Sequence, residues 1–423
     1  MAYTRRVIDE ELDALFPHVA AIAIDGPKAV GKTTTARERA RAQLQLDEQG
    51  LRTTIEADPT MLLRRDRPLL IDEWQRVPPV WDVVRRAVDD DSRGGQFLLT
   101  GSATPSAEAS LHSGVGRIGR LRMRPMTLPE RGATHPTVSL SALLSGRRPP
   151  LEGSTGLTLA DYAHHVTSSG FPAIRTLGDR ARRFQLDSYL ATVAEHDFPE
   201  LGHPLRRPTG LQAWLRAYAA ASSTTARLEA ISDAAAAGEG SRPARTTTLA
   251  YRETLMRLWL LDPLPAWTPS TNHLTRLQQS PKHHLADPAL AARLLGLDAD
   301  ALLDGEGEVV GRRGAIMLGT LVESLATLSV RVFAQAAEAD TAHLRTANGD
   351  HEVDIVVVTS SGKVVALRVK TTTAVDDDDT RHLRWLRSKL GDRMLDAAVL
   401  TTGPDAYRRS DGIGVIPLAL LGP

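Results

Sequence analysis

A glycine-rich loop near the N-terminus constrains this chain more than any other feature. The segment GPKAVGKT, residues 26–33, fits the pattern G-x-x-x-x-G-K-[ST] at every position. It follows the apolar run AAIAID and precedes a stretch with helical character, which is the strand–loop–helix context that a phosphate-binding loop requires. The sequence therefore predicts an α/β unit with a parallel sheet, whose first strand leads into a nucleotide-binding loop.

The residue types in the loop indicate how it would hold ATP. Glycines allow backbone N–H groups to close around phosphate oxygens, and the N-terminus of the following helix adds a positive dipole end. We expect the ammonium group of Lys32 to contact the β- and γ-phosphates and the hydroxyl group of Thr33 to bind Mg²⁺. The predicted ATP contacts in this segment are Gly26, Pro27, Lys28, Ala29, Val30, Gly31, Lys32, Thr33 and Thr34.

A second apolar strand, PLLIDE, supplies acidic partners for the loop. Asp72 ends this strand at the carboxyl edge of the sheet, where ligands bind in open α/β folds, and we expect it to hold Mg²⁺ through water. Glu73 is then the natural general base for the attacking water. Together the loop and this strand predict a Mg²⁺-dependent ATP hydrolase.

Two later features of the same region have less specific interpretations. The strand FLLTGS ends in hydroxyl groups. Thr100 or Ser102 could orient the water or sense the γ-phosphate, although Ser and Thr are also common where strands end. In GRIGRLRMR, Arg117 and Arg120 have glycine neighbours. Either is a candidate arginine finger, acting within the chain or on a neighbouring subunit, or else a solvated residue of a basic strand.

Composition narrows the remaining classes. The chain has 423 residues, of which 51 are basic, 51 are acidic and none is cysteine. We therefore expect two or three domains, no disulfide or cysteine-based metal site, and no overall field that would attract nucleic acid. Apolar runs are too short for a membrane span and the N-terminus is charged, so we expect a cytoplasmic protein. Lysine is rare, so we interpret a lysine as a candidate marker of a place that calls for a compact ammonium group, and two of the six fall in motifs that ask for lysine: Lys28, Lys32, Lys282, Lys363, Lys370 and Lys389.

The pattern of elements divides the chain into four parts. Residues 1–135 alternate apolar strands and charged helices, residues 136–158 are rich in Gly, Pro and Ser and predict a linker, residues 159–305 are helical, and residues 306–423 form a small α/β domain. In the first part a helix is expected from Thr34 to about Leu46. The strands expected there are residues 20–25, 52–57, 68–72, 96–101 and 121–124.

Charged residues in the last part follow the layout of a PD-(D/E)xK nuclease. Asp354 lies on the strand EVDIVVV, Lys370 ends the strand VVALRVK, and Glu323 lies on a preceding helix. Arg368 takes the position of the second acid, where a cation should expel a metal ion. A structural network of these four residues is therefore favoured over an active nuclease, and a groove that binds nucleic acid stays an alternative.

The helical part contains one candidate DNA-contacting element. The segment TTTLAYRETL has a capping residue and an amphipathic pattern, and LWLLDP after it predicts an exit strand, as in a winged-helix recognition element. Arg245 and Arg252 would then contact DNA, together with Arg368 and Lys370. The same shape also serves for packing between domains.

In this order the motifs resemble a known family. GPKAVGKTT, LLIDEWQRVP, FLLTGSATP and GRIGRLRMRPMTLPE are similar to the bacterial and archaeal AAA-type ATPases that carry a C-terminal conserved domain of unknown function. SSGFP, SPKHHLADP and HEVDIVVV extend the resemblance over nearly the whole chain. It implies an α/β fold with an additional-strand P-loop ATPase domain, a winged-helix-like helical middle and a nuclease-like C-terminal α/β domain. Lys28 departs from the family, in which Arg is usual.

The resemblance implies no particular substrate. The leading hypothesis is an ATP hydrolase whose turnover rearranges the other domains, with DNA as a candidate partner. The alternative is a nucleotide-gated protein-binding or signalling switch with slow hydrolysis, and the minor alternative is a metal-dependent DNA nuclease. Relatives of AAA type often form rings, so an oligomer is a further expectation.

Overall fold

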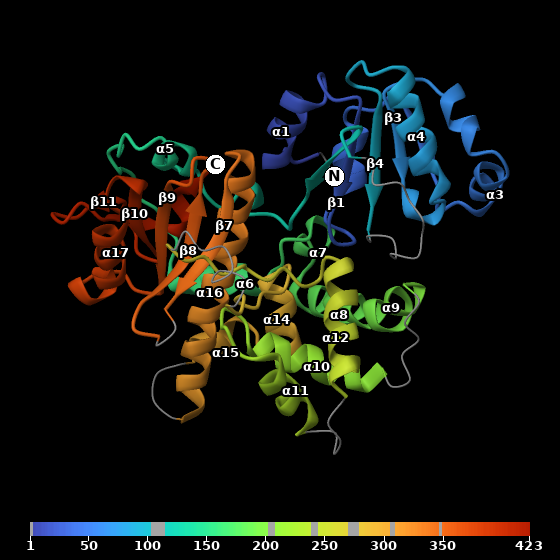
Figure 1. Cartoon of the computed structure of the whole chain (residues 1–423). Helices are drawn as coiled ribbons and strands as arrows, with labels where there is room; N and C mark the ends of the chain where they lie inside the picture. Colours follow the sequence, from blue (N-terminus) through green and yellow to red (C-terminus); the bar gives the residue numbers. More distant parts are fainter. Residues whose placement is uncertain are drawn as a thin grey trace.

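The computed structural model describes residues 3–102, 115–201, 208–237, 244–269, 279–304, 309–346 and 349–423. Two α/β units flank a helical unit, which lies between and below them in Figure 1. The N-terminal unit is blue in that view, the helices are green to yellow, and the C-terminal unit is orange to red. The predicted domain boundary at residues 305 and 306 lies outside the described residues.

The N-terminal unit is built on a five-stranded sheet in the order β2-β3-β4-β1-β5, and all of its paired strands are parallel. β4 separates β1, which leads into the glycine-rich loop, from β3, which carries the acidic residues. The last strand begins at Ile118, three residues before the predicted start. The elements are α1 (Val7–Leu15), β1 (Ala21–Asp25), α2 (Lys32–Arg37), β2 (Ala42–Gln45), α3 (Gln49–Ala57), β3 (Leu69–Asp72), α4 (Pro79–Asp90), β4 (Phe97–Gly101) and β5 (Ile118–Arg122).

Side chains of this sheet alternate between two cores, as the period of a strand dictates. Ile22 and Ile24 of β1 belong to the core that the sheet shares with α1 and the helical unit. Ala23 faces the other core, which contains Trp74 and Trp81 with ring centroids 4.6 Å apart. Because both faces are covered, β1, β3 and β4 are buried along their length, and a ligand is expected at the edge of the sheet where these strands end.

Two predicted elements of this unit are wrong. Residues 52–57, predicted as a strand, belong to helix α3, where the hydroxyl groups of Thr53 and Thr54 donate to carbonyl oxygens four residues earlier. The helix predicted to run to residue 46 ends at Arg37, and residues 42–45 form the edge strand β2. The segment ARAQLQL is rich in helix formers, so its pairing with β3 overrides local propensity.

The helical unit packs around one long helix, α16 (Val309–Ala336), with which it shares a core. Within α16, Ile316–Ala336 is long and apolar enough to cross a membrane by length and composition, but most of it is buried in the protein, as a core helix is. The other elements are α6 (Leu159–Thr167), α7 (Pro172–Arg175), α8 (Asp179–Thr192), the π-helical turn η4 (Val193–Asp197), α9 (Phe198–Glu200), α10 (Pro208–Ala220), α11 (Leu228–Ala236), α12 (Arg245–Arg257), α14 (Pro288–Leu294) and α15 (Ala299–Leu303).

The C-terminal unit is a six-stranded mixed sheet in the order β11-β12-β10-β9-β8-β7. β10 is parallel to β9 and β12, whereas β8 is antiparallel to both of its neighbours. One face packs on α17 and the other on α16. The elements are β7 (Asp340–Arg345), β8 (Glu352–Val358), β9 (Val364–Lys370), α17 (Asp377–Leu390), β10 (Met394–Thr401), β11 (Tyr407–Arg408) and β12 (Gly414–Pro417).

The segment predicted as a linker, residues 136–158, has structure of its own. It contains β6 (Val138–Ser139) and α5 (Leu140–Leu144), and β6 pairs with β13 (Leu421–Gly422) near the C-terminus. Further along, the backbone N–H of Thr155 donates to the carbonyl oxygen of Pro404 at 2.8 Å. The segment therefore packs on the C-terminal unit on its way from the N-terminal unit to the helices.

Candidate nucleotide site

The glycine-rich loop requires glycine at two positions. Gly26 has a φ of +153°, and a Cβ atom there would lie 2.2 Å from the carbonyl oxygen of Met123. Gly31 has a φ of +108° and precedes the first residue of α2. A side chain would be strained at either position, so the loop can take this path only with these glycines.

Lys32 is folded into the loop. Its Nζ donates to the carbonyl oxygens of Gly26 and Pro27 at 2.8 and 2.7 Å, and its side chain is buried. Burial lowers the pKa of Lys32 from 10.5 to about 8, although nearby carboxylates oppose the change. This buried ammonium group has lost its hydration and would gain from an anionic partner such as a phosphate.

The structure brings Thr33, Asp72 and Thr100 together. Asp72 of β3 lies beside Thr100 of β4 in the register of the sheet. Both threonine hydroxyl groups donate to Oδ1 of Asp72, that of Thr33 at 2.8 Å. Hydroxyl and carboxylate oxygens are ligands that suit Mg²⁺. These residues therefore fit a magnesium ion bound by Thr33 and, through water, by Asp72.

Glu73 lies next to Asp72 in the left-handed backbone conformation, with a φ of 53°. Its Oε2 accepts hydrogen bonds from Nε2 of Gln75 and, at 3.0 Å, from Oγ of Ser102. Ser102 thus donates a hydrogen bond to Glu73, the predicted general base, whereas Thr100 donates one to Asp72, the predicted metal ligand. Such a backbone at a residue with a Cβ atom costs roughly 1–3 kcal/mol and is typical of functional sites.

The two candidate arginine fingers lie three residues apart at β5, and their ion-pair partners lie toward opposite ends of this strand. Nε of Arg120 lies 2.7 Å from Oδ2 of Asp25, the residue that ends β1 before the loop. Arg117 precedes β5 and pairs at 2.8 Å with Asp89 near the end of α4, beside the start of β1. Within this chain the structure therefore brings Arg120, and not Arg117, close to the loop.

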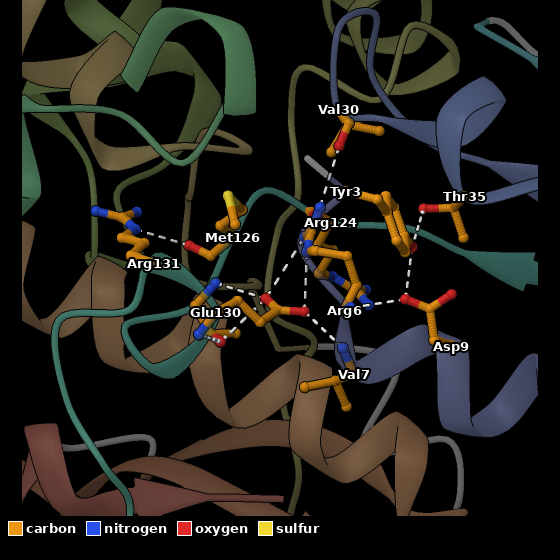
Figure 2. A network of polar contacts seen from close by, with 11 residues as sticks. Tyr3, Arg6, Val7, Asp9, Val30, Thr35, Arg124, Met126, Glu130 and Arg131 are labelled. Atoms are coloured by element: carbon orange, nitrogen blue, oxygen red, sulfur yellow. Dashed lines mark hydrogen bonds and ion pairs between the residues drawn. The ribbon is translucent and has the colours of Figure 1, made fainter. Parts of the chain in front are cut away.

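A buried arginine that sequence reasoning missed supports the loop. Arg6 donates to the carbonyl oxygens of Val30 in the loop, at 3.2 Å, and of Arg124, at 2.8 Å. Its Nε donates at 3.0 Å to Glu130, which also accepts the backbone N–H of Val7 at 2.7 Å. Figure 2 shows the guanidinium group between the loop and Glu130. These partners of Arg6 lie 24 to 124 positions along the chain, so no local pattern marks it.

A cavity of about 600 Å³ adjoins the loop. Gly31, Thr34 and Thr35 line one side, and residues from the segments 3–6, 129–132 and 172–177 line much of the rest. Apolar side chains such as Met123, Met126 and Leu177 line it together with polar and charged ones such as Thr34 and Arg175, a combination that occurs in small-molecule sites. The volume suits a ligand of nucleoside size.

The loop also contacts the helical unit through Lys28. Its Nζ donates a hydrogen bond to Oδ1 of Asp197 in the π-helical turn η4. The Asp197 side chain is 4% exposed, whereas that of Lys28 is 35% exposed. This ion pair between the loop and a buried carboxylate of the helical unit connects the site to the helices. The carboxylate lies in a π-helical turn, and such turns are frequent at functional sites.

Three arginines converge on Asp262, in the segment after α12. Arg122 ends β5, and Arg124 lies two residues further on the same side. Their guanidinium groups lie 3.0 and 2.8 Å from the carboxylate of Asp262, and that of Arg331 on α16 lies 2.8 Å from it. Burial alone would raise the pKa of Asp262, but the three positive charges outweigh it and hold that pKa far below its usual range. The carboxylate of Asp262 thus links the N-terminal unit, the helical unit and α16 through ion pairs.

Two motifs of the helical unit contact each other. Asp287 of SPKHHLADP caps α14 and accepts hydrogen bonds from Oγ of Ser169 and from the backbone N–H of Gly170, both at 2.7 Å. The carbonyl oxygen of Gly170 accepts the N–H of Met126 at 2.8 Å. The motifs SSGFP and SPKHHLADP therefore join α14 to the segment that follows β5.

The charged network predicted for the C-terminal unit is wrong in one member. Nζ of Lys282 lies 2.9 Å from Glu323 and 3.0 Å from Asp354, and Arg368 lies 3.4 Å from the other oxygen of Asp354. Lys370 instead pairs at 2.8 Å with an aspartate of α17. Lys282, which precedes Asp354 by 72 positions, takes the central position instead.

Burial and a neighbouring carboxylate alter the titration of this network. Burial, together with the charge of Asp354, raises the pKa of Glu323 to about 8. Burial would also raise the pKa of Asp354, but Lys282 and Arg368 hold it at about 2. Within the described ranges, no group of three or more His, Asp or Glu side chains is arranged to hold a metal ion. The cation at this point is the protein's own ammonium group.

The predicted DNA contacts are divided between two units. Arg245 is exposed at the start of α12 and Arg252 is half-buried on the same helix. Arg368 donates to the carbonyl oxygen of Glu352 at 2.7 Å and faces Asp354, and Lys370 is paired with an acid as well. The two cations of the C-terminal unit are therefore engaged within the chain.

These features define the class of protein to which the N-terminal unit is similar. A parallel sheet with β4 between β1 and β3, a glycine-rich loop that contains Lys32, and the contact of Thr33 with Asp72 are those of an ATPase-like nucleotide-binding domain. A family model described as an AAA domain matches residues 18–131.

The rest of the chain is similar to proteins without an assigned activity. A domain of unknown function, DUF8612, matches residues 159–301, and another, DUF4143, matches residues 318–421. Two uncharacterized proteins, from Mycobacterium tuberculosis and Mycobacterium bovis, are each 26% identical to this chain over 425 residues, which cover 99% of it and 84% of the relative. The chain is thus similar to an AAA domain in its N-terminal part and to the DUF4143 domain in its C-terminal part.

Proposed function

We propose that this chain is a Mg²⁺-dependent ATP hydrolase. The observation that carries the proposal is the contact between Thr33 and Asp72 at the sheet edge where the glycine-rich loop lies. In this function Gly26 to Thr34 bind the phosphates, with the ammonium group of Lys32 against the β- and γ-phosphates. Mg²⁺ held by Thr33 and Asp72 would neutralise part of the negative charge of the phosphates.

Glu73 is the residue that would take a proton from the attacking water. Its hydrogen bonds with Gln75 and Ser102 hold the carboxylate in one orientation, which is what a general base requires. Arg120 is the in-chain candidate for a cation that stabilises developing charge. Its ion pair with Asp25 would have to open first, so an arginine from a neighbouring copy is the alternative.

The cavity beside the loop would take the nucleoside. It adjoins Gly31 and Thr34, which flank the two residues proposed to hold phosphate and metal ion. Apolar side chains such as Met126 and Leu177 would contact the base, and Tyr3 also lines the cavity. Phosphate and nucleoside would thus bind in adjoining parts of one site.

Hydrolysis would be coupled to the helical unit through Lys28. The ammonium group of Lys28 extends from the loop to the buried carboxylate of Asp197. A phosphate bound in the loop would compete with Asp197 for this charge, and loss of the γ-phosphate would weaken that competition. Exchange of ATP for ADP would therefore change how firmly η4 is held against the loop.

Steady-state phosphate release tests the proposed activity. Wild type should turn over ATP with Mg²⁺, Lys32→Ala should not bind nucleotide productively, and Glu73→Gln should retain ATP while its turnover falls about a hundredfold or more. Turnover by Glu73→Gln at the wild-type rate would exclude Glu73 as the general base. Ser102→Ala provides a milder variant that keeps the carboxylate but removes one of its hydrogen bonds.

The second candidate function is a nucleotide-gated protein-binding or signalling switch with slow hydrolysis. The engagement of Arg120 with Asp25 favours it, because this arginine is then not free to stabilise charge on a phosphate. Phosphate release with and without single-stranded and duplex DNA separates the two functions. Turnover that rises with DNA supports a DNA-coupled hydrolase, whereas ATP that stays bound without turnover supports the switch.

A further inference from the structure

Tyr3 lines the cavity beside the glycine-rich loop. Among the described residues that line this cavity of about 600 Å³, Tyr3 is the one with an aromatic side chain. The residue is half-buried, so part of its surface remains accessible to a ligand. Aromatic rings are surfaces on which nucleobases stack. The cavity therefore offers a base one such surface within the described part of the chain.

The hydroxyl group of Tyr3 is fixed at two points. It donates to Oδ2 of Asp9 at 2.5 Å and lies 2.9 Å from the hydroxyl oxygen of Thr35. A phenol has one proton to donate and a carboxylate can only accept, so Thr35 is the donor in the second contact. Figure 2 shows the hydroxyl group of Tyr3 joined to both partners. Two contacts at one end of the ring restrict how the ring can turn.

Asp9 is itself held firmly. Its side chain is 1% exposed, and its Oδ1 lies 2.8 Å from Nη1 of Arg39. Its Oδ2 also accepts the backbone N–H of Arg6 at 2.6 Å. Burial raises the pKa of Tyr3, and the hydrogen bond to Asp9 raises it further, so the phenol stays protonated and keeps donating. The anchor of Tyr3 is thus a buried, charge-paired carboxylate.

Thr35 connects Tyr3 to the segment proposed to hold phosphate. Thr35 lies on α2, two residues after Thr33, and its backbone N–H donates to the carbonyl oxygen of Gly31 at 3.0 Å. Gly31, Thr34 and Thr35 line the same cavity as Tyr3. The base and the phosphates of a nucleotide are joined through one ribose, so they require such adjoining surfaces.

We propose that Tyr3 is the residue that binds the nucleobase. The base lies against the ring of Tyr3, and the hydrogen bonds of the hydroxyl group hold that ring in position. This inference rests on the proposed nucleotide-binding function and assigns the base to one wall of the cavity. Because every base has a π face, the contact contributes affinity without selecting among bases.

Calorimetric titration of the full chain with Mg²⁺ and either ADP or ribose 5-diphosphate tests this inference. Ribose 5-diphosphate is ADP without its base, and ATP turnover does not disturb either titration. Tyr3→Ala should raise the Kd for ADP by about tenfold or more, as expected for loss of a stacked aromatic ring, and leave the Kd for ribose 5-diphosphate unchanged. Lys32→Ala should weaken the binding of both ligands.

Tyr3→Phe separates the ring from its hydroxyl group. This variant keeps the aromatic surface and loses both hydrogen bonds, so the Kd for ADP should rise by only about twofold to threefold. Tyr407→Ala is the matched control, because Tyr407 lies on β11 in the C-terminal unit and is 40% exposed. It should bind both ligands as wild type does.

Three results would overturn the inference while the phosphate site stands. Tyr3→Ala could bind ADP as tightly as wild type, or it could lose affinity for both ligands equally, which would mean that Tyr3 supports the loop and not the base. Equal losses for Tyr3→Phe and Tyr3→Ala would mean that the hydroxyl group alone matters. The proposed function itself fails if the wild type binds neither ligand.

Discussion

Replacement of Arg6 by methionine connects the stability of the N-terminal unit to nucleotide binding. Arg6 and Glu130 form an ion pair whose side chains are 4% and 5% exposed. The same guanidinium group donates to Val30 in the glycine-rich loop and to Arg124 beyond β5. Methionine fills much of the volume but makes none of these contacts, so Glu130 loses its counter-charge and the loop loses a support.

The expected magnitude follows from burial. Removal of one partner of a buried ion pair costs about 3–5 kcal/mol of unfolding free energy. We expect a value near the lower end, because Glu130 still accepts the backbone N–H groups of Val7 and Thr127 at 2.7 and 2.8 Å. A lost hydrogen bond from a charged donor to the loop should in addition raise the Kd for ATP by about tenfold.

Urea denaturation and calorimetric titration with Mg²⁺ and ATP measure the two effects. Arg93→Met is the matched control, because Arg93 lies in the same unit, its side chain is 86% exposed, and it pairs with Asp91 at the surface and does not line the cavity. Arg93→Met should resemble wild type in both assays. If Arg6→Met unfolds at the same urea concentration as Arg93→Met and binds ATP equally well, the support we assign to Arg6 does not exist.

Three further predictions concern other charges of the protein. Because burial holds the pKa of Lys32 at about 8 and a bound phosphate would raise it, the affinity for ATP should fall as the pH increases above 8, in a binding titration with Lys32→Met as the blank. Asp262→Asn leaves three arginines without their acid and should lower the unfolding free energy by about 3–5 kcal/mol at pH 7. The folded pKa of Asp262 lies below its ordinary value of 3.8, so its contribution is present above that pH and is lost as the pH falls further; the difference between variant and wild type in urea should therefore shrink at pH 3. Asp197→Asn should still bind ATP but lose the ATP-dependent change in hydrogen exchange of η4, and an unchanged response would show that Lys28 does not transmit it.

Much of the fold could be predicted where the pattern is local. The strand before the loop, the strand that ends in Asp72 and the strands EVDIVVV and VVALRVK all form as expected, because their apolar runs are bounded by turn residues. Prediction failed at residues 42–45 and 52–57, where β2 is rich in helix formers and α3 contains β-branched residues. Residues 42–45 form a strand because β3 offers them an edge to pair with, and no local pattern reveals that edge.

The candidate site divides in the same way. The contact of Thr33 with Asp72 could be predicted, because the loop and the end of an adjacent parallel strand must meet at one edge of the sheet. Sequence reasoning also singled out Lys28 and Lys282 as members of a rare residue type, but not their partners. Asp197 is 169 positions from Lys28, and Asp354 is 72 positions from Lys282. Partners at such separations are set by how the units pack.

By itself the sequence determined the glycine-rich loop, the strand before it, the presence of a helix after it though not its length, and the acidic strand beside it, because each depends on backbone conformation and alternation over a few residues. Only the tertiary structure decided that Arg6 supports the loop, that Arg120 lies closer to it than Arg117, and that Lys282 rather than Lys370 lies among the C-terminal acids. A charged side chain can be buried only where opposite charges reach it, and those charges come from whichever units the packing brings together.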